Sequence, residues 1–248
     1  MTRKQHRLIC LAVLSVASGY IAGCTTKPTI VSASTIKVIS TQQALSKDKQ
    51  TPVESVMSQL QWVYTTNEQL SPTKKDILWE ATFGNESIVT IKVPNSTYPW
   101  YNFVFLSHQG QEWNFSAIAD SPCPPERTTS QKEGIALPME TFSVTKMTVG
   151  SEFRRVWTFA SDIKTLVIGK YPRESFTQPE GAKALKIKDN DAWQITSDSN
   201  QTLFYYFDQG QLVWMVGNLS ESELLNVAIS LPSVSDPLFP STMQPNRM

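Results

Sequence analysis

The chain has 248 residues with 22 basic and 22 acidic side chains, and 40% of its residues are hydrophobic, including 7 Trp. Loss of the three basic residues of the first segment would leave a slightly acidic chain with a formal charge near −3. That balance argues against a nucleic-acid partner, which would need a clustered basic face. The apolar content is enough for a proper core, and the length predicts one globular unit or two small subdomains.

Residues 1–23 have the order of a secretory signal peptide. They contain no acidic residue, an apolar run spans Leu8 to Val16, small residues follow, and the basic residues at the start are Arg3, Lys4 and Arg7. The apolar run is too short to span a bilayer, which needs roughly 20 apolar residues. We therefore expect this segment to be removed from the mature protein.

The signal segment ends in Ile21-Ala22-Gly23-Cys24, which resembles the bacterial lipobox. The resemblance implies that Cys24 receives diacylglycerol and that the protein is held to a membrane from its extracytoplasmic side, because two acyl chains anchor durably. Thr25 stands where an aspartate would indicate inner-membrane retention, so a Gram-negative host implies the outer membrane and a Gram-positive host its single membrane. The alternative is an ordinary cysteine after a conventional cleavage site.

A flexible tether is predicted for residues 24–51. From Thr25 onward this stretch is rich in Ser, Thr, Lys and Gln and has no Gly and no aromatic residue. Such a composition buries too little apolar surface to offset the entropy lost on ordering. The alternative is an edge strand from Thr29 to Ser40.

Residues 52–231 are predicted to form an α+β globular region, an antiparallel twisted β-sheet built from hairpins with amphipathic helices packed on it. Helical spacing of apolar residues predicts a helix from Pro52 to Tyr64. The capping-box spacing of Ser220 and Glu223 predicts a last helix that ends before Pro232. Alternating apolar residues predict strands at 77–83, 89–93, 102–107, 111–119, 142–149, 153–159, 163–168, 184–188, 192–197, 203–207 and 212–216.

Two proline-rich stretches interrupt this pattern. Residues 121–138 hold four prolines and are predicted to be a long loop, which is the natural boundary if there are two subdomains. Residues 232–248 are also rich in proline and are predicted to be a disordered tail.

The stretch from about Gly181 to Leu231 resembles the end of a domain of unknown function found in Gram-positive envelope lipoproteins and anti-sigma-factor-like proteins. The residues that support the resemblance are the hairpin end Gly210-Gln211-Leu212-Val213-Trp214, the turn Gly217-Asn218-Leu219 and the helix that follows. It implies a last helix packed against an antiparallel sheet, and it implies no catalytic residues.

Candidate catalytic and metal-binding groups are sparse. His108 and Cys123 are the only His and the only unmodified Cys expected in the mature chain, and no nucleophile motif surrounds either of them. Since Cys123 has no disulfide partner, its burial would explain its survival in an oxidising compartment, and a low-oxygen or Gram-positive setting is the alternative. Asp189-Asn190-Asp191 is predicted to be a turn because the glycine and the distal glutamate of a calcium loop are missing. We expect no catalytic residues, no metal site and no cofactor, although a dispersed pair of catalytic carboxylates stays open.

The sequence Tyr98-Pro99-Trp100-Tyr101 does not alternate and follows Pro94, so Tyr98, Trp100 and Tyr101 are predicted to present aromatic rings on a loop, as binding sites often do. These features together predict a non-enzymatic envelope lipoprotein that binds or senses a protein, peptide or lipid. The alternatives are a lipid-handling carrier or chaperone with an apolar cavity, and, less favoured, a cell-wall hydrolase.

Overall fold

The computed structural model describes residues 51–110, 112–130, 134–173, 180–196 and 201–241, together with the backbone of residues 33–38. Strands account for about half of the described residues, which also include two short α-helices, α1 (Pro52–Gln59) and α2 (Glu221–Ser230). The protein is therefore a β-rich antiparallel fold, and the α+β prediction is correct only in its hairpins and in its two helices.

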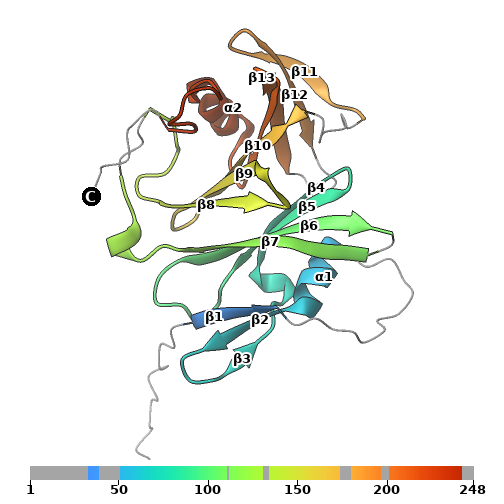
Figure 1. Cartoon of the computed structure of the whole chain (residues 1–248). Coiled ribbons are helices and arrows are strands. Elements are labelled where there is room, and N and C mark those ends of the chain that lie inside the picture. The colour runs from blue at the N-terminus through green and yellow to red at the C-terminus, as the bar shows by residue number, and fades with distance from the viewer. Residues whose placement is uncertain are drawn as a thin grey trace, which may run out of the picture.

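The strands form three antiparallel sheets (Figure 1). The smallest has the order β1 (Ala33–Val38), β2 (Leu60–Tyr64) and β3 (Gln69–Leu70). The second has the order β4 (Ile77–Phe83), β5 (Glu86–Lys92), β6 (Trp100–Gln109) and β7 (Glu112–Pro122).

The third sheet has seven strands in the order β11-β12-β13-β14-β10-β9-β8. Their bounds along the chain are β8 (Ser143–Val149), β9 (Ser151–Ala160), β10 (Thr165–Pro172), β11 (Lys183–Ile187), β12 (Asn190–Thr196), β13 (Thr202–Asp208) and β14 (Gln211–Gly217). Consecutive strands pair in every hairpin that the alternation predicts. One pairing is not local. Strand β10 pairs with β14, although β11, β12 and β13 lie between them in the sequence.

The sheets stack in layers, with α1 and the small sheet below the four-stranded sheet and α2 above the seven-stranded sheet (Figure 1). Three hydrophobic clusters fill the spaces between these layers. The middle cluster joins Trp79 and Phe103 of the four-stranded sheet to Val167 and Trp214 of the seven-stranded sheet. Because this core is shared, residues 121–138 do not divide the chain into two separately packed subdomains.

The start of that predicted loop belongs to β7, and its last described part packs on the face of the seven-stranded sheet. It contains the 3-10 turn η2 (Pro125–Arg127) and a bridge between Thr129 and Phe142. Ile135 and Leu137 are buried in the same cluster as α2. The segment is therefore anchored by apolar side chains at its far end.

The helix predicted from Pro52 to Tyr64 is wrong beyond Gln59. Thr51 starts the helix, because its Oγ1 accepts a hydrogen bond from Glu54 N at 3.2 Å while Glu54 Oε2 accepts one from Thr51 N at 2.9 Å. From Leu60 the chain is the strand β2, with alternating burial. The apolar residues at 60 and 64 fit both a helical and a two-residue period, and pairing with β1 and β3 selects the strand.

Strand β1 falls inside the predicted tether and pairs with β2 from Ala33 opposite Tyr64 to Val38 opposite Leu60. The alternative edge strand is thus observed over residues 33–38. Cys24 and the rest of the predicted signal and tether, up to residue 50, lie outside the described residues.

The segment after α2 differs from the predicted disordered tail as far as residue 241. Val234 and Phe239 are buried in the cluster beneath α2. Asp208 Oδ2 accepts a hydrogen bond from Val234 N at 2.8 Å, and Lys170 Nζ donates one to Val234 O at 2.7 Å. Burial of these two apolar side chains therefore orders a proline-rich segment that was predicted to be disordered. Residues 242–248 lie outside the described residues.

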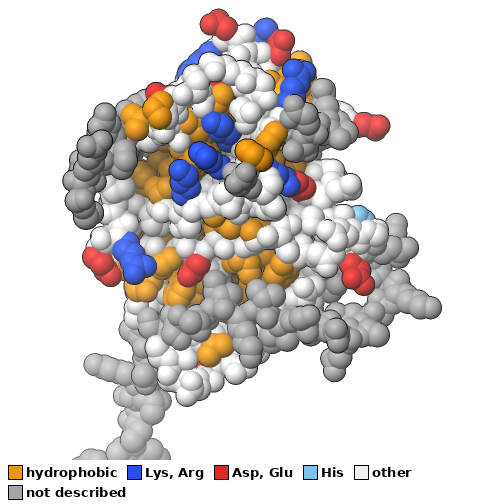
Figure 2. Space-filling view, in the orientation of Figure 1, with side chains coloured by type: hydrophobic (Ala, Val, Ile, Leu, Met, Phe, Trp, Pro, Cys, Tyr) orange, Lys and Arg blue, Asp and Glu red, His pale blue; other side chains and the backbone are white. Residues whose placement is uncertain are grey.

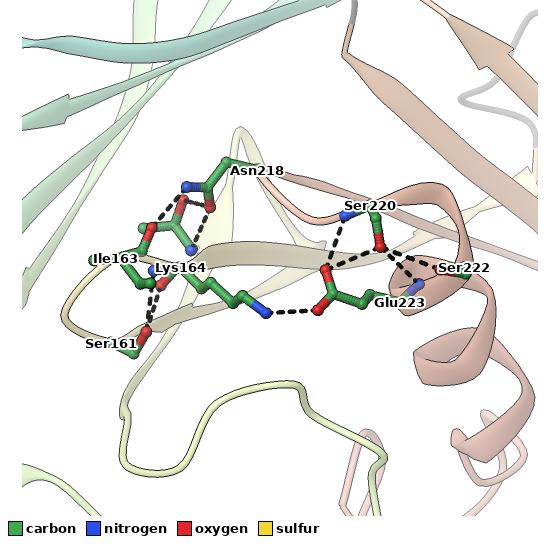
Figure 3. Close-up of polar contacts among 8 residues, drawn as sticks. Ser161, Ile163, Lys164, Asn218, Ser220, Ser222 and Glu223 are labelled. Carbon is green, nitrogen blue, oxygen red and sulfur yellow. Dashed lines mark hydrogen bonds and ion pairs between the residues drawn. The ribbon is translucent and has the colours of Figure 1, made fainter.

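A polar junction links the two large sheets to the start of α2, and Figure 3 shows the part of it between the β9–β10 turn, Asn218 and α2. Thr165 Oγ1 accepts a hydrogen bond from Trp79 Nε1 at 2.8 Å and donates one to Asn218 Oδ1 at 3.0 Å. Asn218 Nδ2 donates to Ile163 O at 2.7 Å. The Asn218 side chain therefore fixes the β9–β10 turn against the end of β14.

The predicted capping box at the start of α2 is confirmed. Ser220 N donates to Glu223 Oε2 at 2.9 Å, and Ser220 Oγ accepts from Glu223 N at 3.3 Å. The other oxygen of Glu223 accepts from Lys164 Nζ at 2.5 Å, so an ion pair ties the helix start to the β9–β10 turn (Figure 3).

Gly169 on β10 tests the packing of the middle core. A Cβ at this position would lie 2.0 Å from Trp214 Cε2, so Gly169→Ala forces the indole to move. We expect Gly169→Ala to lower the free energy of unfolding by about 2 kcal/mol, measured by urea denaturation. The double variant Gly169→Ala/Trp214→Phe should lose less than the two single variants combined, because the smaller ring leaves space. Additive losses would contradict the contact.

Candidate functional site

An open hollow of about 350 Å³ lies where the β5–β6 loop of the four-stranded sheet meets the β9–β10 turn of the seven-stranded sheet. The loop supplies residues 93–99, and Asp162 comes from the turn. The remaining walls are Lys92 at the end of β5 and two residues of the 3-10 turn η1 (Lys74–Asp76), Lys75 and Asp76. The hollow therefore joins three segments that are far apart in the sequence.

The loop that forms its floor is held at both ends. Val93 N donates to Trp100 O at 2.8 Å, and Cys123 N donates to Pro99 O at 2.8 Å. Tyr64 of β2 donates its hydroxyl to Pro94 O at 2.9 Å. Such fixed ends present the intervening side chains from a defined position, which suits a binding loop.

Only one of the three predicted aromatic residues faces the hollow. Tyr98 is half-buried and lines it, with its ring stacked on Trp100 at a centroid distance of 6.2 Å. Trp100 and Tyr101 open β6 instead and are buried, with 5% and 1% of their surface exposed. The prediction of three rings displayed on a loop is therefore wrong for these two, because strand pairing begins at Trp100.

The buried pair supports the site from below. Tyr101 donates its hydroxyl to Asp162 O at 2.5 Å, and burial raises the pKa of Tyr101 well above its usual value. This bond joins β6 to the β9–β10 turn across the gap between the sheets. Tyr101 is a positioning residue for the hollow rather than part of its surface.

A chain of polar side chains runs behind Trp100. Trp62 Nε1 donates to Asn102 Oδ1 at 2.7 Å, and Asn102 Nδ2 donates to Asp120 Oδ1 at 2.9 Å. Trp100 Nε1 donates to the same oxygen of Asp120. Desolvation raises the pKa of Asp120, although the two hydrogen bonds act in the opposite direction. These bonds satisfy two buried indoles and fix the ring that supports Tyr98.

The lining of the hollow is mixed, with polar and apolar surface in similar amounts and charges of both signs. Lys75 and Lys92 are exposed, and Asp162 is exposed on the opposite element. Asp76 is nearly buried and accepts hydrogen bonds from Thr73 N at 2.8 Å and Thr73 Oγ1 at 2.6 Å. Ser96 Oγ is shielded from solvent and has no hydrogen-bond partner among the described residues. An unsatisfied hydroxyl at this position can bond to a ligand.

His108 and Cys123 do not meet. His108 lies at one end of β6 opposite Trp113, whereas Cys123 follows Pro122, which is opposite Trp100 at the other end. Eight residues of strand separate the two positions, or about 27 Å. A nucleophilic pair of these two side chains is therefore excluded by geometry.

Cys123 is buried, with 6% of its surface exposed, and lies near Ser143 Oγ at 3.1 Å and Ala160 O at 3.4 Å. Burial raises the pKa of the thiol, against the smaller effect of the hydrogen bond with Ser143. Of the explanations that the sequence leaves open for an unpaired thiol, burial is the one observed.

Asp189 lies in the predicted turn, between β11 and β12, and Asp191 forms a surface ion pair with Lys186. Throughout the described ranges, no group of three or more His, Cys, Asp or Glu is placed to hold a metal ion. Likewise, neither of the helices described is long and apolar enough to cross a bilayer.

The space between the layers is filled by large side chains. The largest fully buried residues are Trp62, Trp214, Tyr64, Tyr101, Tyr205, Phe103 and Phe204. A carrier for acyl chains needs an apolar cavity of several hundred Å³. The hollow beside Tyr98 has a comparable volume, but it is open to solvent and about half of its wall is polar, with charged side chains among the lining residues.

The sequence pattern missed Lys75, Lys92 and Asp162, because no motif or period connects the three segments. Only the register of β5 with β6, and the packing of one sheet on the other, bring these residues together. Comparison of the whole chain with protein-family models, with curated proteins and with solved structures finds no match.

The burial of Cys123 predicts slow thiol chemistry. In a Cys10→Ser/Cys24→Ser chain, we expect the native thiol to react with Ellman's reagent on the order of 100-fold more slowly than the urea-unfolded thiol at pH 8, because a raised pKa and low access both reduce the reactive thiolate. Absorbance kinetics would measure this. Equal rates in the two states would mean that the thiol is accessible.

Proposed function

We propose that this protein is an envelope lipoprotein, held to the membrane by diacylglycerol on Cys24, and that its β-rich body binds a peptide segment of another envelope protein in the hollow beside Tyr98. The observation on which the anchoring depends is Ile21-Ala22-Gly23-Cys24 after a basic and apolar start. In this proposal the protein binds or senses and performs no chemistry.

The N-terminal segment supports the anchored arrangement. Strand β1 begins at Ala33, nine residues after Cys24, so at most about 30 Å of extended chain separates the lipid from the folded body. That length exceeds the thickness of a headgroup layer and keeps the body close to the membrane surface. The region would be a short spacer followed by a strand rather than one long tether.

The lining of the hollow favours a peptide over an acyl chain. Lys75 and Lys92 can pair with carboxylates, Asp162 can pair with an amine or guanidinium, and Tyr98 offers a flat ring for an apolar side chain. Ser96 Oγ adds a hydroxyl without a partner among the described residues. A peptide has all of these complementary groups, whereas a lipid tail has none except the apolar one.

The C-terminal part agrees with an envelope role without specifying it. Helix α2 packs on the seven-stranded sheet through Leu224, Val227 and Ala228. This is the arrangement that the resemblance to envelope lipoproteins implies. We keep membership of that group as part of the proposal.

Cys24→Ala tests the anchor. Expressed in a related bacterium, the wild-type protein should gain the mass of the lipid and sediment with membranes, and the variant should do neither, because only the cysteine thiol accepts diacylglycerol. Intact mass and membrane fractionation measure both properties. Cys10→Ala is the matched control, since that cysteine lies within the apolar run, and it should behave as the wild type. A Cys24→Ala variant that keeps the lipid or the membrane would refute the anchoring.

Tyr98→Ala tests the hollow. Peptides selected from a random display library on the full chain in detergent should bind Tyr98→Ala at least about tenfold more weakly in fluorescence anisotropy, because an aromatic wall is a typical hot spot. Ile229→Ala truncates an apolar side chain on α2 that is 46% exposed and lies outside the hollow, and this variant should bind as the wild type does. Loss of binding in the control alone would place the peptide outside the hollow.

A further inference from the structure

A second polar surface lies on the face of the seven-stranded sheet that α2 covers only in part. Lys146 of β8, Arg155 of β9 and Lys170 of β10 belong to this face, since Lys146 is opposite the buried Trp157 and Arg155 is opposite Lys170. Figure 2 shows Lys and Arg side chains gathered among hydrophobic ones over β8 and β9. We call these three residues the basic cluster.

Aromatic rings fix two members of the basic cluster. Lys146 Nζ lies 5.6 Å from the centroid of the Trp157 ring, and Lys170 Nζ lies 5.7 Å from that of Phe239. Lys170 Nζ also donates a hydrogen bond to Val234 O. The positive charges are therefore held in place before any partner arrives, which lowers the entropic cost of binding.

The positive charges of the cluster are not neutralised. Among the described side chains, no carboxylate forms an ion pair with Lys146, Arg155 or Lys170. Burial lowers the pKa of Lys170, and the charges of Arg155 and Lys146 lower it further, against the opposite effect of Asp208. Like charges on facing strands cost stability, so their juxtaposition calls for a compensating role.

Protection of a sheet edge against pairing explains only Lys146 among the three residues of the basic cluster. A lysine on an edge strand discourages pairing with another chain, and β8 is an edge strand. Strands β9 and β10 each have neighbours on both sides, so edge protection does not account for Arg155 or Lys170. The arrangement is better explained as a site for an anionic group.

Exposed apolar residues flank the cluster. Val144 lies two residues before Lys146 on β8 and is 46% exposed, and Phe153 lies two residues before Arg155 on β9 and is 66% exposed. Arginine and aromatic side chains, here Arg155 and Phe153, are enriched at protein interfaces. A purely ionic ligand would leave these apolar residues without a function.

The position of the cluster favours a partner other than the protein's own membrane. The basic cluster lies on the outer face of the seven-stranded sheet, whereas β1, which follows the proposed lipid anchor, lies beyond the four-stranded sheet on the opposite side (Figure 1). Stacked sheets are about 10 Å apart, so this face points away from the anchored end. This step rests on the proposed anchoring.

We propose that Lys146, Arg155 and Lys170, together with Val144 and Phe153, form a docking surface for an acidic segment of a partner protein that also has apolar side chains. The surface is distinct from the hollow beside Tyr98. Arg155 lies five residues before the end of β9 at Ala160, or about 17 Å along the strand, and Asp162 lies beyond that end in the β9–β10 turn.

The test uses the full chain in detergent and a short peptide of alternating glutamate and leucine, with binding followed by fluorescence anisotropy. We expect binding that weakens as salt is added, and at least about tenfold weaker binding by Lys146→Glu/Arg155→Glu. The matched control Arg127→Glu/Lys183→Glu makes the same change in net charge at two exposed positions and should alter binding less than about twofold. Urea denaturation of both double variants verifies that each is folded.

A charge-neutral variant keeps the test informative if the first one unfolds. Phe153→Ser should abolish the preference for the glutamate–leucine peptide over a glutamate–serine peptide. No binding by the wild type, or equal weakening in the two double variants, would overturn the docking surface. Binding to phosphatidylglycerol vesicles through the basic cluster, without binding to the peptide, would overturn it in favour of a lipid surface.

The same measurement separates this inference from the proposed function. Tyr98→Ala should bind the acidic peptide as tightly as the wild type does. Loss of binding in Tyr98→Ala would place the peptide in the hollow, which would overturn the docking surface and leave the proposed function standing. Absence of lipid on Cys24 would remove the anchoring but would not alter peptide binding by the basic cluster in detergent.

Discussion

Burial of both faces of the central strands in both large sheets is the constraint on which the rest of the structure depends. Antiparallel sheets commonly leave one face in water, but in β10 the consecutive residues Leu166, Val167 and Ile168 are all fully buried. Leu166 and Ile168 pack beneath α2, and Val167 packs against the four-stranded sheet. Each layer therefore needs a cover, which is why α2, the loop ending at Phe142 and the segment around Phe239 lie where they do.

The same constraint places the candidate sites at the margins of the layers. The hollow beside Tyr98 lies where a loop of one sheet meets a turn of the other, and Tyr101 bonds across that gap. The basic cluster lies where the cover of the seven-stranded sheet is incomplete. In both places, polar groups that the interior could not accommodate remain accessible to a partner.

Local pattern was sufficient for the hairpins and for the cap of α2, because alternation and a capping box are set by neighbours in the sequence. It predicted a helix at Leu60–Tyr64, where pairing with neighbouring strands determines the structure. It predicted disorder at Val234 and Phe239, which are buried in a core formed by residues distant in the sequence. For the candidate site it identified Tyr98 but gave Trp100 and Tyr101 the wrong environment. Local pattern could not predict that Lys75 and Asp162 belong to the site, since only tertiary packing brings them next to the Tyr98 loop.

The pairing of β1 with β2 has a mechanical consequence. In the proposed anchoring, a lipid at Cys24 would transmit any pull between membrane and partner into the start of β1, and a pull along the strand would load its pairing with β2. Antiparallel pairing from Ala33 to Val38 then resists in shear, with its hydrogen bonds loaded together rather than opened one by one. Strand β2 passes the load to a core that contains Trp62. If the proposed lipid is present, the first strand would be the point at which tension enters the folded body, and the force needed to separate β1 from β2 would limit the tension that the attachment could sustain.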